Sequence, residues 1–235
     1  MIAILAAHTD CFERAALSTH VRALHGGTLR RAGALAELCL AGAHACLADA
    51  PAQSSALLWG SRAGIREASA RVIDELCVRQ EPPLPFDFLA TQPILAAVPL
   101  RQQLPGLRCA LYQPWGGDDL ANWSRMLHLA RLWLRAGRYQ RVLCGQLEPG
   151  ATEQRGSWLL LGRADASVPA LAGLSVDAPG AGARVTLRPC TDPVVEIRHA
   201  LNERNATATP RVLSLPAADP LPPLYVWRTL AARQT

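Results

Sequence analysis

The sequence contains no lysine, so its formal net charge of +5 comes from arginine alone. Without lysine the chain cannot form a Schiff base, bind phosphates through a Walker-type P-loop, or use a lysine as a catalytic base. The arginines are scattered, and the aromatic residues, only 5% of the chain, do not alternate with them. This distribution does not favour nucleic-acid binding, whereas an acidic protein partner or an anionic carrier is compatible with it.

Cysteine and histidine spacings that are typical of metal sites or redox pairs are also missing. The seven cysteines include no CxxC pair, and the six histidines include no HxxxH or HExxH pattern. An odd number of cysteines, several on apolar faces of expected elements, indicates buried thiols that act as small hydrophobic residues. The segment from Gly180 to Gly182 lacks the third glycine of a dinucleotide-binding loop. We therefore expect no disulfide, no metal and no cofactor.

Long apolar runs are absent as well. No run approaches the roughly 20 residues that a membrane-spanning helix needs. The first ten residues, MIAILAAHTD, are too short for a signal peptide and lack its basic region. Half of the 235 residues are hydrophobic, which is enough to build a sizeable globular core. We expect a cytoplasmic protein without a membrane span.

The most informative stretch that is present runs from residue 109 to residue 146. A short β-prone segment ends at a Pro-Trp-Gly-Gly turn, and a 3.6-residue apolar period then predicts a helix followed by a second buried strand. Asp118 or Asp119 is expected to cap this helix, and Gly137 to end it. The order predicts a parallel βαβ unit, in which the turn at 113–120 is the place for a reactive or ligand-binding group. Two carboxylates would repel an anion there, so we interpret the turn as a glycine turn with an aspartate cap.

Strands and helices alternate along the rest of the chain. We expect an α/β fold with a mainly parallel mixed sheet and flanking helices. Arg62 and Arg66 are one turn apart and could contact a carrier protein or be solvated; we interpret them as solvated. The polar segment at 145–156 predicts a loop. Strands are expected at 1–7, 55–60, 157–163, 183–190 and 211–215, with a broken strand within 166–179. Helices are expected at 29–50, 61–78, 89–104 and 193–205.

Three features of the stretch 109–146 match a known pattern: the helix segment 127–130 (LHLA), Gly137, and the strand segment 142–145 (VLCG). Their sequence and spacing resemble the nucleophile region of the β-ketoacyl synthase family, which has the thiolase fold. The upstream segment 86–106 is similar to the family's helix before the nucleophile strand, and 157–163 to the strand after it. The likeness covers residues 55–163. It implies a single ketosynthase-like domain over 1–235, with its core at about 30–165 and a C-terminal extension at 166–235.

The departures from the family decide what the resemblance implies about activity. Leu120 stands where the family has its nucleophilic cysteine, and a leucine side chain cannot attack a thioester. The family's second half carries two histidines and a lysine, but after Gly150 this chain has only His199. The resemblance therefore implies no catalytic residue and no condensing activity of the chain alone.

One branch of the family lacks the active cysteine in the same way, namely the chain-length-factor-like partners of ketosynthases. Short members of this branch resemble proteins of aryl-polyene and related polyketide pigment pathways. The resemblance implies a heterodimer with an active ketosynthase that extends an acyl chain on an acyl carrier protein. The resemblance also implies that the strand at 109–113 joins the two subunits and that bulky residues of this chain lie at the end of the partner's tunnel. The candidate interface and tunnel residues are Cys109, Leu111, Gln113, Trp115, Trp123 and Met126.

An alternative function stays open. A stand-alone acyltransferase or thioester hydrolase would need a nucleophile outside the family pattern, such as Ser124 or Cys144. Turnover of acyl thioesters by the isolated chain would distinguish it from a partner subunit. His128 lies in the middle of the expected helix and is interpreted as a structural histidine.

Overall fold

One mixed β-sheet organises the computed structural model, which describes residues 2–26, 29, 33–48, 52–163, 172–179, 183–187, 192–202, 211–218 and 220–228. Nine described strands lie side by side in the order β3-β2-β4-β5-β1-β6-β9-β8-β7. β2 pairs in parallel with β3 and β4, β7 pairs in parallel with β8, and the other pairs are antiparallel. The strands are β1 (Ile2–Glu13), β2 (Ser55–Gly60), β3 (Leu107–Tyr112), β4 (Arg141–Pro149), β5 (Glu153–Arg163), β6 (Ala172–Ser175), β7 (Ala183–Thr186), β8 (Arg211–Leu215) and β9 (Leu224–Arg228).

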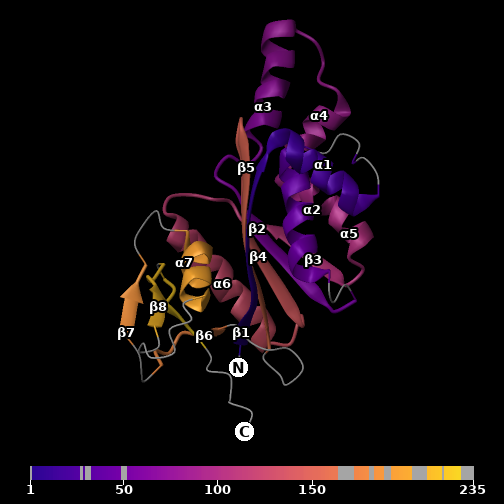
Figure 1. The fold of residues 1–235 in the computed structure, drawn as a ribbon. Helices are drawn as coiled ribbons and strands as arrows, with labels where there is room; N and C mark the ends of the chain where they lie inside the picture. Colours follow the sequence, from indigo (N-terminus) through magenta and orange to yellow (C-terminus); the bar gives the residue numbers. More distant parts are fainter. Residues whose placement is uncertain are drawn as a thin grey trace.

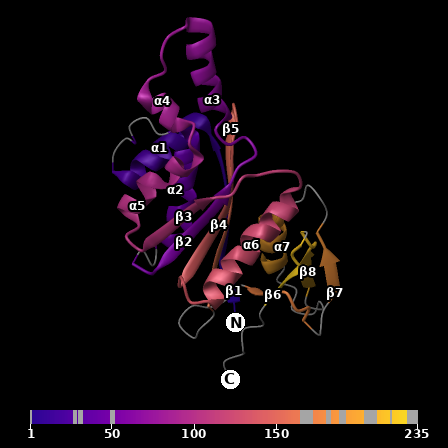
Figure 2. The ribbon, with the colours of Figure 1, turned by 180° about the vertical axis from the view of Figure 1, so that it is seen from behind.

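Helices cover both faces of this sheet, which confirms the α/β class with flanking helices (Figures 1 and 2). α1 (Arg14–His25), α2 (Ala34–Leu47) and α5 (Val98–Gln103) contribute to one apolar cluster. α6 (Asp119–Arg135) and α7 (Pro193–Asn202) contribute to a second cluster on the opposite face. The molecule is therefore a three-layer α/β/α arrangement. No helix within the described ranges is long and apolar enough to cross a membrane.

The close packing of α2 on the sheet depends on glycine. A Cβ atom added at Gly42 would lie 1.9 Å from the indole of Trp158, and one added at Gly145 would lie 2.3 Å from it. Trp158 is fully buried between the helix and the strands. Glycine is unfavourable inside a helix, and its presence in the middle of α2 is explained by this approach of the indole.

The βαβ prediction is correct in direction but not in adjacency. β3 and β4 are both parallel to β2, and β2 lies between them. Asp118 caps α6, because its carboxylate accepts hydrogen bonds from the backbone N–H groups of Leu120 (3.3 Å) and Ala121 (3.2 Å). Gly137, with φ 70°, follows the helix in the left-handed region that favours glycine.

The loop expected at 145–156 was wrong. β4 continues to Pro149 and β5 begins at Glu153, so the two strands form an antiparallel hairpin. Gln146 and Gln154 suggested a loop, yet both are buried and hydrogen-bonded; the Gln154 amide, for example, donates to the Gly150 carbonyl (2.6 Å). Polar side chains that find partners inside the fold do not interrupt a strand.

Residues 66–98 form a helical arm, which comprises α3 (Arg66–Ile73), the π-helix η1 (Asp74–Arg79), α4 (Pro85–Ala90), the 3₁₀ helix η2 (Pro93–Ala97) and the start of α5. Its α3 and α4 extend beyond the sheet (Figure 1), whereas its last part packs against α2 and β3. The continuous helix expected at 89–104 was wrong, because Pro93 opens a separate 3₁₀ turn. The apolar side chains of the helix expected at 61–78 form no continuous buried face. Of the residues Ile65, Val72, Ile73, Leu76 and Cys77, only Val72 is buried.

The C-terminal strands extend the sheet beyond β1. β6 pairs with β1 through Ala3 and Gly173, and β9 and β8 continue outward from β6. The strand at Arg211–Leu215 is confirmed, whereas β9 and α1 were not predicted. The expected strands at 1–7 and 183–190 appear as β1, which is longer, and β7, which ends at Thr186. Cys190 and residues 203–205 lie outside the described residues.

Candidate functional site

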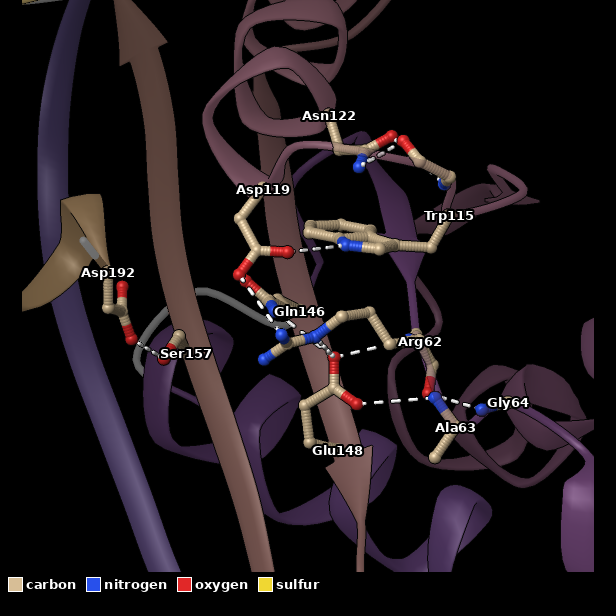
Figure 3. A network of polar contacts seen from close by, with 12 residues as sticks. Arg62, Ala63, Gly64, Trp115, Asp119, Asn122, Gln146, Glu148, Ser157 and Asp192 are labelled. Atoms are coloured by element: carbon tan, nitrogen blue, oxygen red, sulfur yellow. Dashed lines mark hydrogen bonds and ion pairs between the residues drawn. The ribbon is translucent and has the colours of Figure 1, made fainter. Parts of the chain in front are cut away.

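The carboxyl ends of the parallel strands β2, β3 and β4 meet beside the first turn of α6, at the position that the sequence singled out (Figure 3). Gly60 at the end of β2 is opposite Gln146 of β4, and the Gln113 N–H donates to the Trp59 carbonyl (2.8 Å). Parallel strands bring their carboxyl ends to one edge, so residues distant in sequence converge here.

Leu120 occupies the first turn of α6 with no exposed surface. Its side chain packs into the same apolar cluster as Trp123 and Met126. A helix N-terminus stabilises a thiolate, but leucine has no group that ionises. The nearby Asn122 is occupied structurally, since its amide nitrogen donates to the carbonyls of Gly116 (3.0 Å) and Asp118 (2.9 Å). The first turn of α6 therefore has the helix N-terminus that would stabilise a thiolate, but no nucleophilic side chain at Leu120.

Glu148 anchors a polar network across this edge (Figure 3). Its carboxylate accepts hydrogen bonds from the backbone N–H groups of Arg62 (3.1 Å) and Ala63 (3.3 Å) and from the Gln146 amide (3.1 Å). The Arg62 guanidinium lies 3.4 Å from Glu148 and 3.6 Å from Asp119. Arg62 was interpreted as solvated; more than half of its side chain is exposed, and it also bridges two carboxylates, which the sequence did not indicate.

Trp115 closes the end of β2. Its indole N–H donates to Asp119 (2.9 Å), and its ring lies against Gly60, where an added Cβ would be 2.4 Å from the ring. Glycine at position 60 leaves the room that this indole fills. Protein groups thus occupy the space above the strand ends. Sequence reasoning found Trp115 but missed Glu148, whose interest follows only from the strand register that places it beside Arg62.

The six residues predicted for an interface or a tunnel separate into three settings. Cys109 and Leu111 lie on β3, the outermost strand on that side of the sheet, and Leu111 is 40% exposed. Gln113 and Trp115 are partly buried at the turn. Trp123 and Met126 are fully buried, and the Trp123 indole donates to Gln146 (2.9 Å) inside the core. Their roles toward a partner stay predictions.

The alternative nucleophiles are both fully buried. The Ser124 hydroxyl has no hydrogen-bond partner among the described residues, so no base activates it there. Burial raises the pKa of the Cys144 thiol well above its usual range, so the thiol stays protonated and unreactive. His128 Nε2 lies 2.8 Å from the Pro222 carbonyl and links α6 to the C-terminal segment. Within the described ranges no cluster of three or more His, Cys, Asp or Glu side chains is arranged for a metal.

Comparisons with known proteins identify the fold. No family model matches the chain, and no curated protein matches it. The structure of the ketosynthase ApeO with its chain length factor ApeC from Xenorhabdus doucetiae is similar, at 14% identity, with 97% of this chain and 99% of that chain covered and a TM-score of 0.60.

Two further structures agree. The ishigamide ketosynthase/chain length factor gives 13% identity, 97% and 100% coverage and a TM-score of 0.64. The AntDE:AntF complex, a type II polyketide synthase acyl-carrier protein with its ketosynthase, gives 9% identity, 97% and 99% coverage and a TM-score of 0.61. The coverage is nearly complete on both sides, so the matched chains are about as long as this one. The chain has the thiolase-like fold of ketosynthase and chain length factor structures.

Proposed function

We propose that this chain is a non-catalytic, chain-length-factor-like partner of a β-ketoacyl-carrier-protein synthase. In the heterodimer the partner supplies the nucleophile and extends an acyl or polyene chain on an acyl carrier protein. This chain supplies a docking surface and part of the wall that limits product length. The fold and the two-chain character of similar structures support the proposal.

The observation that carries the proposal is an apolar surface on the arm. Ten of the fourteen exposed large hydrophobic residues found in the described ranges lie between residues 73 and 98. Monomeric proteins rarely leave such a concentration in water, and it is typical of a surface that a partner buries. These residues are Ile73, Leu76, Val78, Leu84, Phe86, Phe88, Leu89, Ile94, Leu95 and Val98.

The open edge of β3 is continuous with this surface. η2 and α5 of the arm region pack against β3, and no described strand pairs with the outer side of β3. An unpaired strand edge presents backbone donors and acceptors that another chain can satisfy. A partner that docks along β3 would therefore cover the adjacent arm in the same step.

The turn before α6 supports the absence of catalysis. Leu120 is buried where the family has its nucleophile, and Arg62, Asp119 and Glu148 satisfy one another. In the heterodimer, Trp115 is the best placed of the candidate residues to contact a growing acyl chain, because its ring lies at the turn. Trp123 and Met126 are fully buried behind it and would act by supporting that wall.

Co-expression with an active ketosynthase tests the proposal. We expect a stable heterodimer by size-exclusion chromatography, condensation of carrier-bound substrates by the complex, and no thioester turnover by this chain alone. If the isolated chain hydrolyses or transfers acyl thioesters and loses that activity on Ser124→Ala or Cys144→Ala, the partner function is wrong and the stand-alone enzyme is correct.

A further inference from the structure

A cavity of about 480 Å³ lies at the end of α6 opposite the candidate site. The first turn of α6 borders the strand ends described above, whereas its last turns lie beside β1 and β6 (Figure 2). Arg131 and Arg135 of these last turns line the cavity. Ile2, Leu174 and Trp227 supply the apolar part of the lining. The volume is within the range of small-molecule sites, roughly 300–1,000 Å³.

Three arginines dominate the polar part of the lining. Arg131 and Arg135 extend from α6, Arg163 ends β5, and Asp177 is the single carboxylate among the lining residues. Arg163 is held in place, because its guanidinium donates to the carbonyls of Leu134 (3.1 Å) and Arg135 (3.2 Å) at the end of α6. Cations near a helix C-terminus are favourable, and this contact explains Arg163.

Arg135 is the last residue of α6, so the helix C-terminus favours its charge as well, but neither Arg131 nor Arg135 donates to the terminal carbonyls as Arg163 does. Within the described part of the chain neither guanidinium forms a hydrogen bond or an ion pair. They are four residues apart on one helix, a spacing at which like charges repel. Partial burial and the charge of Arg135 lower the pKa of Arg131, and Asp177 only partly opposes this. The fold thus holds two cations together beside the cavity, with Asp177 as the one carboxylate among the described lining residues.

We propose that this cavity binds a phosphate monoester that carries a flat or apolar group. Three guanidinium groups and one carboxylate leave two positive charges, which the dianion of a phosphate monoester neutralises and a carboxylate does not. Arginine binds phosphate oxygens through paired N–H donors. The indole of Trp227, with Ile2 and Leu174, offers the surface for the rest of the ligand. The site is independent of the partner function, because it requires only residues of this chain.

Isothermal titration calorimetry with phenyl phosphate tests the proposal on the full chain or on the heterodimer. Inorganic phosphate has the charge without the ring, and benzenesulfonate has the ring with a single charge. We expect phenyl phosphate to bind at least about tenfold more tightly than either. Arg131→Gln and Arg135→Gln should each weaken phenyl phosphate binding by about tenfold or more. Arg101→Gln, an exposed arginine on α5 that does not line the cavity, is the matched control and should change nothing.

Three results would overturn the site. They are no phenyl phosphate binding at millimolar concentration, equal affinity for phenyl phosphate and benzenesulfonate, and affinity unchanged by both arginine substitutions. Arg135 is exposed, so Arg135→Gln decides the outcome if the partly buried Arg131→Gln does not fold. Loss of binding with intact heterodimer assembly identifies the cavity as a ligand site separate from the docking surface.

Discussion

The sheet core and the helical arm are both rich in apolar residues, but the core buries them and the arm leaves many of them exposed. In the core, Trp158, Leu57 and Leu143 have no exposed surface. In the arm, Val78 is 73% exposed and Phe88 is 56% exposed. Core residues contact neighbours from several strands and helices, whereas α3 and α4 pack mainly on each other and on η1 and η2. Apolar composition therefore shows where burial is needed, and only the set of contacts shows whether this chain provides it.

The sharpest test of the comparison is thiol chemistry. Cys77 on the arm is exposed and Cys144 in the core is fully buried, with its pKa raised by burial. Only the thiolate reacts, and a buried thiol must also wait for the core to open. At pH 8 we expect iodoacetamide to modify Cys77 about a thousandfold faster than Cys144, measured by peptide mass spectrometry.

Two controls belong to this experiment. Cys46, whose pKa burial raises to about 12, should be protected like Cys144. In denaturant, Cys77 and Cys144 should react at similar rates. Equal labelling of both in the native chain would show that the core is open and would remove the basis of the comparison.

A substitution on each side of the comparison gives the next largest effect. Trp158→Ala empties the slot between Gly42 and Gly145 and should reduce the free energy of unfolding by about 3–5 kcal/mol. Phe88→Ala removes an exposed ring and should change it by less than about 0.5 kcal/mol. Urea denaturation followed by circular dichroism measures both. A large loss for Phe88→Ala would mean that the arm is structural in the isolated chain.

Assembly is the smallest of the three effects and the one closest to function. Val78→Ser with Phe88→Ser should leave the isolated chain folded and weaken its association with the ketosynthase by about tenfold or more. Leu132→Ser is the control, because Leu132 is 61% exposed but projects from α6, outside the arm. Surface plasmon resonance gives the dissociation constant of the ketosynthase complex for the arm variant, the control and the unsubstituted chain. Equal affinities for both variants and the unsubstituted chain would exclude the arm from the interface.

Much of the fold was predictable because its signals are local. The strands at 55–60 and 211–215 were predicted correctly, and of the two capping residues proposed, Asp118 and Asp119, the structure has Asp118, since alternation, turn residues and capping chemistry act over a few positions. The β4–β5 hairpin was missed because Gln146 and Gln154 look like loop residues until their partners are known. The exposed face of the arm was missed because a periodic apolar stripe does not reveal which surface covers it.

The candidate site shows the same division. The leucine at position 120 and the absence of lysine are properties of the sequence alone, and no folding can supply the missing groups. The ion pairs of Arg62 with Asp119 and Glu148 depend on three elements far apart in the chain, which only the strand order brings together. The gathering of Arg131, Arg135 and Arg163 at the far end of α6 is likewise a tertiary result. The sequence by itself determined which chemistry is absent, because side-chain identity is local. The tertiary structure decided which groups meet and which surface stays open, because those contacts join distant parts of the chain.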